Sequence, residues 1–215
     1  MPRRRADAVP PSPFAKAQRH LARRDPVLKH LIAAVGPCTL WFEPSHFAAL
    51  ARSIISQQIS GRAAASIRTR LQEALAPAGV TPEAILAAPE ETLRGAGLSG
   101  AKARSLRDLA ERVHSGTLPL DDLAARTDEE VIERLLPVRG IGRWTAQMFL
   151  IFSLGRLDVL PVGDLGLRAG VQRHYRLPEL PKPAELEELA RPWQPYRSVA
   201  TWYMWRSLGT VPQSD

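Results

Sequence analysis

Cysteine is nearly absent from the sequence, and several kinds of site are excluded with it. Cys38 is the only cysteine among 215 residues. The chain can therefore form neither an internal disulfide nor a metal or iron-sulfur site built from several cysteine ligands. The sequence also shows no cluster of histidines and carboxylates that would indicate a catalytic metal. We expect no required cofactor.

Long apolar runs are absent as well. The most apolar segment, about residues 144–154, is much shorter than the roughly 20 residues that cross a bilayer. The basic start, Met1-Pro-Arg-Arg-Arg5, has no apolar run behind it and so differs from a signal peptide. We expect a cytoplasmic protein without a membrane partner.

The alternation of apolar and polar residues that indicates β-strands is missing too, and from Phe14 onward the sequence has helical periodicity. A chain of 215 residues, 45% of them hydrophobic, is long enough for one domain or two closely packed lobes. The predicted fold class is all-α. Residues 1–13 hold four prolines and three arginines, and we expect a disordered basic tail there.

Positive charge is present in excess. The sequence has 29 lysines and arginines against 22 aspartates and glutamates, a net charge of +7. This balance favours a polyanionic partner. Charge alone does not separate DNA, RNA and anionic lipid.

Short polar residues and prolines indicate where several helices begin. Asp25, Ser45 and Ser60 each precede an amphipathic segment and are suited to capping it. The last helix is expected to have Pro195 in its first turn and Gly209 just past its end.

Two predicted helices meet at a very short glycine-rich turn. The first starts with a Thr-x-x-Glu capping box at residues 127–130 and stops at Pro137. Gly140 and Gly142 can take backbone angles that a Cβ disfavours. The second helix, about residues 144–154, is apolar on nearly every face and should be buried.

The start of that second helix is suited to binding an anion, because its free amides and positive dipole end point outward. Arg139 and Arg143 flank it. A dinucleotide-binding fingerprint is rejected, because Thr145 stands where a third glycine belongs and a helix precedes the turn. A tight turn with two solvated arginines remains the simpler alternative.

The segment Leu135-Leu-Pro-Val-Arg-Gly-Ile-Gly-Arg-Trp-Thr-Ala146, followed by Leu160-Pro-Val-Gly-Asp164, resembles the hairpin and Gly/Pro-Asp loop of helix-hairpin-helix DNA glycosylases, in particular the 3-methyladenine DNA glycosylase II family. The similarity covers most of residues 14–210. It implies a two-lobed helical fold without the β-rich lobe that the family often has. One lobe would combine 14–45 with 163–215, and the other would span 46–162 and hold hairpin 137–142.

The resemblance implies that Asp164 is the catalytic residue. An aspartate before a helix could serve only as its N-cap, but in this family the catalytic aspartate has both roles. The base pocket would be lined by Trp144, Met148 and Trp205, with Met148 at a position where a relative has tyrosine.

The resemblance also implies how DNA is held. Gln57 and Gln58 match the wedge that fills the gap left by an extruded base; otherwise they are surface amides that end a helix. The expected phosphate-binding residues are Arg139, Gly140, Gly142, Arg143 and Thr145. One structural monovalent cation could bind the carbonyls of Leu136, Val138 and Ile141.

Superfamily members that also cut the strand use a lysine where this chain has Trp144, and an indole cannot form a Schiff base. We therefore expect a monomeric, nucleoid-associated, monofunctional glycosylase that excises alkylated purines such as 3-methyladenine and 7-methylguanine from duplex DNA. The alternatives are a non-catalytic helix-hairpin-helix DNA-binding module and a glycosylase for another lesion.

Overall fold

The computed structural model describes residues 13–212, and within them it contains helices and no strands. The all-α prediction is confirmed, while most of the basic tail predicted for residues 1–13 lies outside the described residues. The helices are α1 (Ala15–Arg24), α2 (Pro26–Val35), α3 (His46–Ser56), α4 (Gly61–Ala74), α5 (Pro82–Ala87), α6 (Glu90–Gly95), α7 (Gly100–His114), η1 (Leu120–Ala125), α8 (Asp128–Leu135), α9 (Arg143–Phe152), α10 (Leu165–Tyr175), α11 (Pro183–Leu189), η2 (Arg191–Trp193) and α12 (Arg197–Leu208).

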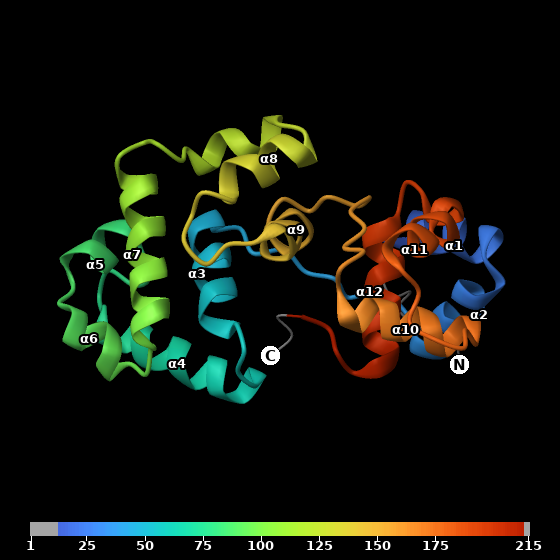
Figure 1. Cartoon of the computed structure of the whole chain (residues 1–215), viewed down its shortest axis with the longest axis horizontal. Helices are drawn as coiled ribbons and strands as arrows, with labels where there is room; N and C mark the ends of the chain where they lie inside the picture. The colour runs from blue at the N-terminus through green and yellow to red at the C-terminus, as the bar shows by residue number, and fades with distance from the viewer. Residues whose placement is uncertain (1–12, 213–215) are drawn as a thin grey trace, which may run out of the picture.

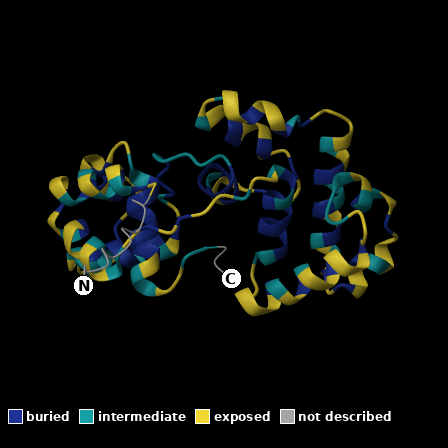
Figure 2. Ribbon diagram, turned by 180° about the vertical axis from the view of Figure 1, so that it is seen from behind, coloured by how far each residue is buried: buried dark blue, intermediate teal, exposed yellow. Residues whose placement is uncertain are grey.

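The helices form two groups (Figure 1). In one group α3 packs against α4, α7 and α9, and α5 and α6 pack against α7. In the other group α12 packs against α2 and α10, although α1 and α2 come from the opposite end of the chain. The buried residues lie along the inner faces of the helices in both groups (Figure 2). The link from α9 to α10 joins the groups, so residues on this link can meet side chains from both.

The predicted helix starts are confirmed at three positions. The Asp25 side chain accepts the amides of Val27 and Leu28, and the Ser45 and Ser60 hydroxyls each accept an amide three residues on. Each side chain satisfies a backbone N–H that would otherwise lack a partner at the helix end.

The start of the last helix differs from the prediction. Helix α12 begins at Arg197, so Pro195 precedes it rather than lying in its first turn. The Tyr196 amide donates to the carbonyl of Trp193 at 2.7 Å, which closes a separate turn before helical hydrogen bonding starts. Gly209 ends the helix in the left-handed conformation (φ 68°), as predicted.

Candidate active site

The hairpin depends on Gly140, which has a φ of +79°. A Cβ at this position would lie 2.8 Å from the Ser105 hydroxyl of α7, so both the backbone angle and the close approach require glycine. Gly142 is the N-cap residue of α9 and has no side chain to satisfy the amides that follow it. The hairpin therefore leaves the positive end of α9 exposed.

The two hairpin arginines differ in their contacts. The Arg139 amide donates to the Asp108 carboxylate at 2.7 Å, and its side chain is exposed. The Arg143 guanidinium contacts the Glu129 carboxylate at 2.5 Å. This pair is solvent-exposed and so contributes little to stability. A phosphate can replace Glu129 at low cost, and phosphate binding by Arg143 stays a prediction.

Backbone carbonyls at the hairpin are hard oxygen donors of the kind that bind cations. The Val138 carbonyl already accepts the Ile141 amide at 3.0 Å, which leaves it one further lone pair. A structural monovalent cation held by Leu136, Val138 and Ile141 stays a prediction.

Asp164 is the N-cap residue of α10 and is 7% exposed. Its Oδ1 accepts the Leu167 amide at 2.6 Å and the Trp205 Nε1–H at 2.7 Å. Its Oδ2 accepts the Trp144 Nε1–H at 2.6 Å. Three short hydrogen bonds to an ionised carboxylate fix the position of both oxygens. The predicted N-cap role is confirmed, and the structure adds two indole donors that the sequence did not reveal.

The two tryptophans are in different surroundings. Trp144 is in the first turn of α9 and is 40% exposed. Trp205 is fully buried in α12 and stacks on Phe152 with ring centroids 5.9 Å apart. Trp205 and Met148 are both 0% exposed, and their place in the base pocket stays a prediction. Trp205 supports Asp164 from the core, and Met148 packs inside the largely apolar α9.

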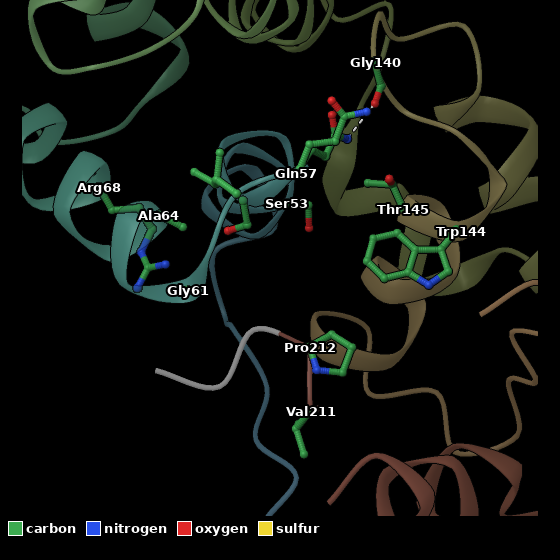
Figure 3. A pocket seen from close by; sticks show the side chains of 13 residues that line it. Ser53, Gln57, Gly61, Ala64, Arg68, Gly140, Trp144, Thr145, Val211 and Pro212 are labelled. Atoms are coloured by element: carbon green, nitrogen blue, oxygen red, sulfur yellow. Dashed lines mark hydrogen bonds between the residues drawn. The ribbon is translucent and has the colours of Figure 1, made fainter. Parts of the chain in front are cut away.

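A cavity of about 550 Å³ opens beside Trp144 (Figure 3). Its wall combines the end of α3, the start of α4, the hairpin and the segment after α12. The lining residues are Ser53, Ser56, Gln57, Gln58, Ile59, Gly61, Ala64, Arg68, Gly140, Trp144, Thr145, Val211 and Pro212. The sequence did not single out Arg68, Val211 or Pro212 as site residues, because they meet the others only through tertiary packing.

The predicted wedge residues lie at this cavity. The Gln57 Nε2–H donates to the Gly140 carbonyl at 2.8 Å, which ties the end of α3 to the hairpin. Gln58 is exposed and has a φ of 58°, a conformation that costs a non-glycine residue about 1 kcal/mol or more. The next residue, Ile59, is 37% exposed although it is apolar. Insertion of this turn into DNA stays a prediction. Ile59 is an exposed apolar residue at the turn that was not among the predicted wedge residues.

The single cysteine is not suited to act as a nucleophile. Cys38 is buried, and burial raises the pKa of its thiol to about 12, so it stays protonated at neutral pH. In residues 13–212 no three histidines, cysteines or carboxylates gather in the way that would hold a metal ion. The same residues contain no helix that is long and apolar enough to span a membrane.

Trp144→Phe tests the hydrogen bond to Asp164 while keeping an aromatic wall. A hydrogen bond to a charged group contributes about 1.5–3 kcal/mol. If the protein has the glycosylase activity that the resemblance implies, we expect single-turnover base release to slow by about tenfold or more. Loss of the same hydrogen bond should lower the free energy of unfolding by up to about 3 kcal/mol, so the rate is measured under conditions in which the variant is folded. An unchanged rate in a rapid-quench assay would show that this contact does not position the carboxylate.

An all-helical fold in which a glycine hairpin lies beside a buried aspartate at a helix start defines a known class. The model of the HhH-GPD superfamily of base excision DNA repair proteins matches residues 51–195, and the chain belongs to this family. The resemblance predicted from the hairpin motif is therefore confirmed.

The relatives make the identification more specific. DNA-3-methyladenine glycosylase 1 of Schizosaccharomyces pombe is 37% identical over 200 residues, which cover 90% of this chain and 87% of the relative. The alkylbase DNA glycosidase-like protein mag2 of the same organism is 33% identical over 200 residues, covering 91% and 94%. The structure of 3-methyladenine DNA glycosylase from S. pombe in complex with abasic DNA aligns with a TM-score of 0.81 at 35% identity, covering 93% of this chain and 100% of that one.

Proposed function

We propose that this protein is a monofunctional DNA glycosylase that hydrolyses the N-glycosidic bond of alkylated purines in duplex DNA. The observation that carries the proposal is the Asp164 carboxylate, which two indole N–H groups and a helix amide hold in a buried position. Relatives named for 3-methyladenine glycosylase activity cover nearly the whole chain, which supports the substrate class.

The proposed chemistry depends on charge. Departure of the base builds positive charge on the deoxyribose, and a fixed carboxylate beside C1′ stabilises it by a few kcal/mol. Water then adds at C1′, giving an abasic site and a free base. Alkylated purines such as 3-methyladenine and 7-methylguanine already carry positive charge and leave as neutral bases. They need little protonation, which fits a site without an evident general acid.

Access to the bond requires that the nucleotide leave the helix, at a cost of a few kcal/mol that is smaller for a weakly paired damaged base. The exposed Trp144 ring offers a face for stacking and cation-π attraction to a cationic base. The turn at Gln57 and Gln58 would occupy the vacated space, and the exposed hairpin and α9 start would hold the phosphates.

Strand cleavage by a Schiff base needs a free amine near C1′. The position of such a lysine is taken by Trp144. The Lys102 amine donates to the Ile55 carbonyl at 2.7 Å and is engaged there. We propose that the protein acts as a monomer, associated with the nucleoid, and requires no cofactor; one structural monovalent cation could bind at the hairpin.

The test uses a duplex oligonucleotide with a single 7-methylguanine. We expect release of the base, an intact strand until hot alkali is added, and no covalent adduct with borohydride. A borohydride adduct or cleavage without alkali would contradict the monofunctional assignment. Tight binding without release from this duplex or one carrying 3-methyladenine would favour a DNA-binding module or another lesion.

A further inference from the structure

One face of α7 contacts both loops that the proposed function places against DNA. Lys102, Ser105 and Asp108 are three residues apart, so they lie on the same side of this helix. Lys102 contacts the end of α3, while Ser105 and Asp108 contact the hairpin. Helix α7 packs along α3 and comes from a segment that carries none of the predicted site residues (Figure 1).

The Lys102 contact holds the last turn of α3. Its Nζ donates to the Ile55 carbonyl at 2.7 Å, one residue before α3 ends at Ser56. Carbonyls in the last turn of a helix lack intrahelical partners, and a cation there also interacts favourably with the helix dipole. Partial burial lowers the pKa of Lys102. The predicted wedge turn, Gln57 and Gln58, begins directly after this contact.

The contacts between α7 and the hairpin are equally short. The Asp108 carboxylate accepts the Arg139 amide at 2.7 Å, and the buried Ser105 packs against Gly140. The Gln57 side chain then links the wedge turn back to the Gly140 carbonyl at 2.8 Å. The wedge turn and the hairpin are therefore joined twice, once directly and once through α7.

We propose that Lys102 is a positioning residue for base extrusion: by holding the end of α3, it fixes the wedge turn against the hairpin. This inference rests on the proposed function. It assigns Lys102 no contact with the reacting atoms. Loss of the contact should weaken unstacking of the duplex and leave cleavage of an unstacked nucleotide unaffected.

The experiment measures unstacking without catalysis. A duplex carries 2-aminopurine next to a tetrahydrofuran analogue of an abasic site, and its fluorescence is recorded at saturating protein. We expect a large rise with the wild type. Lys102→Met, which keeps most of the side-chain length, removes a charged hydrogen bond and should weaken unstacking by about tenfold. A tenfold change in the equilibrium between stacked and unstacked duplex lowers the unstacked fraction from about nine-tenths to about half.

Two further variants separate the contact from the charge. Lys102→Arg keeps a donor and should restore most of the fluorescence rise. Arg104→Met removes a cation two residues away on the same helix and should behave as wild type. A wild-type rise with Lys102→Met, or an equal loss with Arg104→Met, would overturn the proposal.

Excision assays complete the test. Lys102→Met should release 7-methylguanine about tenfold more slowly from duplex DNA, and within about twofold of the wild-type rate from a single strand, which needs no wedge. Equal slowing on both substrates would overturn the positioning role. Absence of a fluorescence rise with the wild type would instead contradict the proposed function.

Discussion

Replacing Asp164 with asparagine is expected to lower the single-turnover rate of base release by about 100- to 1000-fold, the loss typical when preorganised electrostatic stabilisation is removed. The amide has nearly the same shape as the carboxylate but no charge to stabilise the developing cation on the sugar. Its oxygen can still accept the Leu167 amide and the Trp205 indole, now 2.6 and 2.7 Å from Oδ1. The measurement is rapid-quench release from a duplex with one 7-methylguanine.

The fold and DNA affinity serve as controls for this variant. Asparagine caps helices as well as aspartate does. The amide nitrogen would face the Trp144 N–H, but that indole is 40% exposed and can turn toward water. The free energy of unfolding should therefore change by less than about 1 kcal/mol. Binding should be equal or tighter, because a negative charge near the phosphates is lost. Wild-type release by this variant would exclude Asp164 as the catalytic residue.

Replacing Asp25 with asparagine should have the opposite profile, a loss of about 1–3 kcal/mol in the free energy of unfolding with the catalytic step unchanged. Asp25 is also a buried N-cap, 6% exposed, and its Oδ1 accepts the amides of Val27 and Leu28. Its Oδ2 accepts the Tyr175 hydroxyl and, at 3.0 Å, the Trp193 indole.

The loss of stability in Asp25→Asn arises at Oδ2. An amide nitrogen in place of Oδ2 would face the Trp193 N–H, and Trp193 is 0% exposed, so its donor cannot reach water. Burial and the adjacent Asp25 carboxylate raise the pKa of Tyr175, which keeps its hydroxyl a donor. Urea denaturation gives the free energy, and excision by the folded variant gives the rate. A stable variant with impaired catalysis would contradict the structural role.

These two aspartates have nearly the same local chemistry, so burial and indole donors do not by themselves identify a catalytic residue. Their surroundings differ. Asp164 contacts Trp144, which lines the cavity beside the hairpin. Asp25 lies among α2, α10 and η2, in the helix group that lacks the hairpin.

The sequence predicted well what depends on neighbouring residues. Caps such as Ser45 and the capping box at 127–130 act within one helix turn, so their spacing is visible in the chain. The glycine hairpin is local in the same sense. Pro195 was misplaced because a proline fits either position. The helix begins two residues later, where the Tyr196 amide closes a turn on the Trp193 carbonyl and the Ser198 amide donates to the carbonyl of the distant Leu157.

Contacts between distant segments could not be predicted from spacing. No motif in the sequence indicates that Gln57 contacts Gly140 or that Lys102 contacts Ile55. Nor does one indicate that two indoles donate to the same carboxylate. The burial of Trp205 depends on Phe152 and the packing of α12, which the spacing of residues along the chain does not indicate. The sequence likewise did not indicate that Arg143 pairs with Glu129.

The Asp164 site is expected to release alkylated purines by hydrolysis. The most direct test treats duplex DNA with a methylating agent, incubates it with the wild type or with Asp164→Asn, and resolves the free bases by chromatography. We predict that the wild type releases 3-methyladenine and 7-methylguanine with one abasic site per base, and that the variant releases almost none. DNA binding by the wild type without release of either base, or equal release by both proteins, would contradict the account.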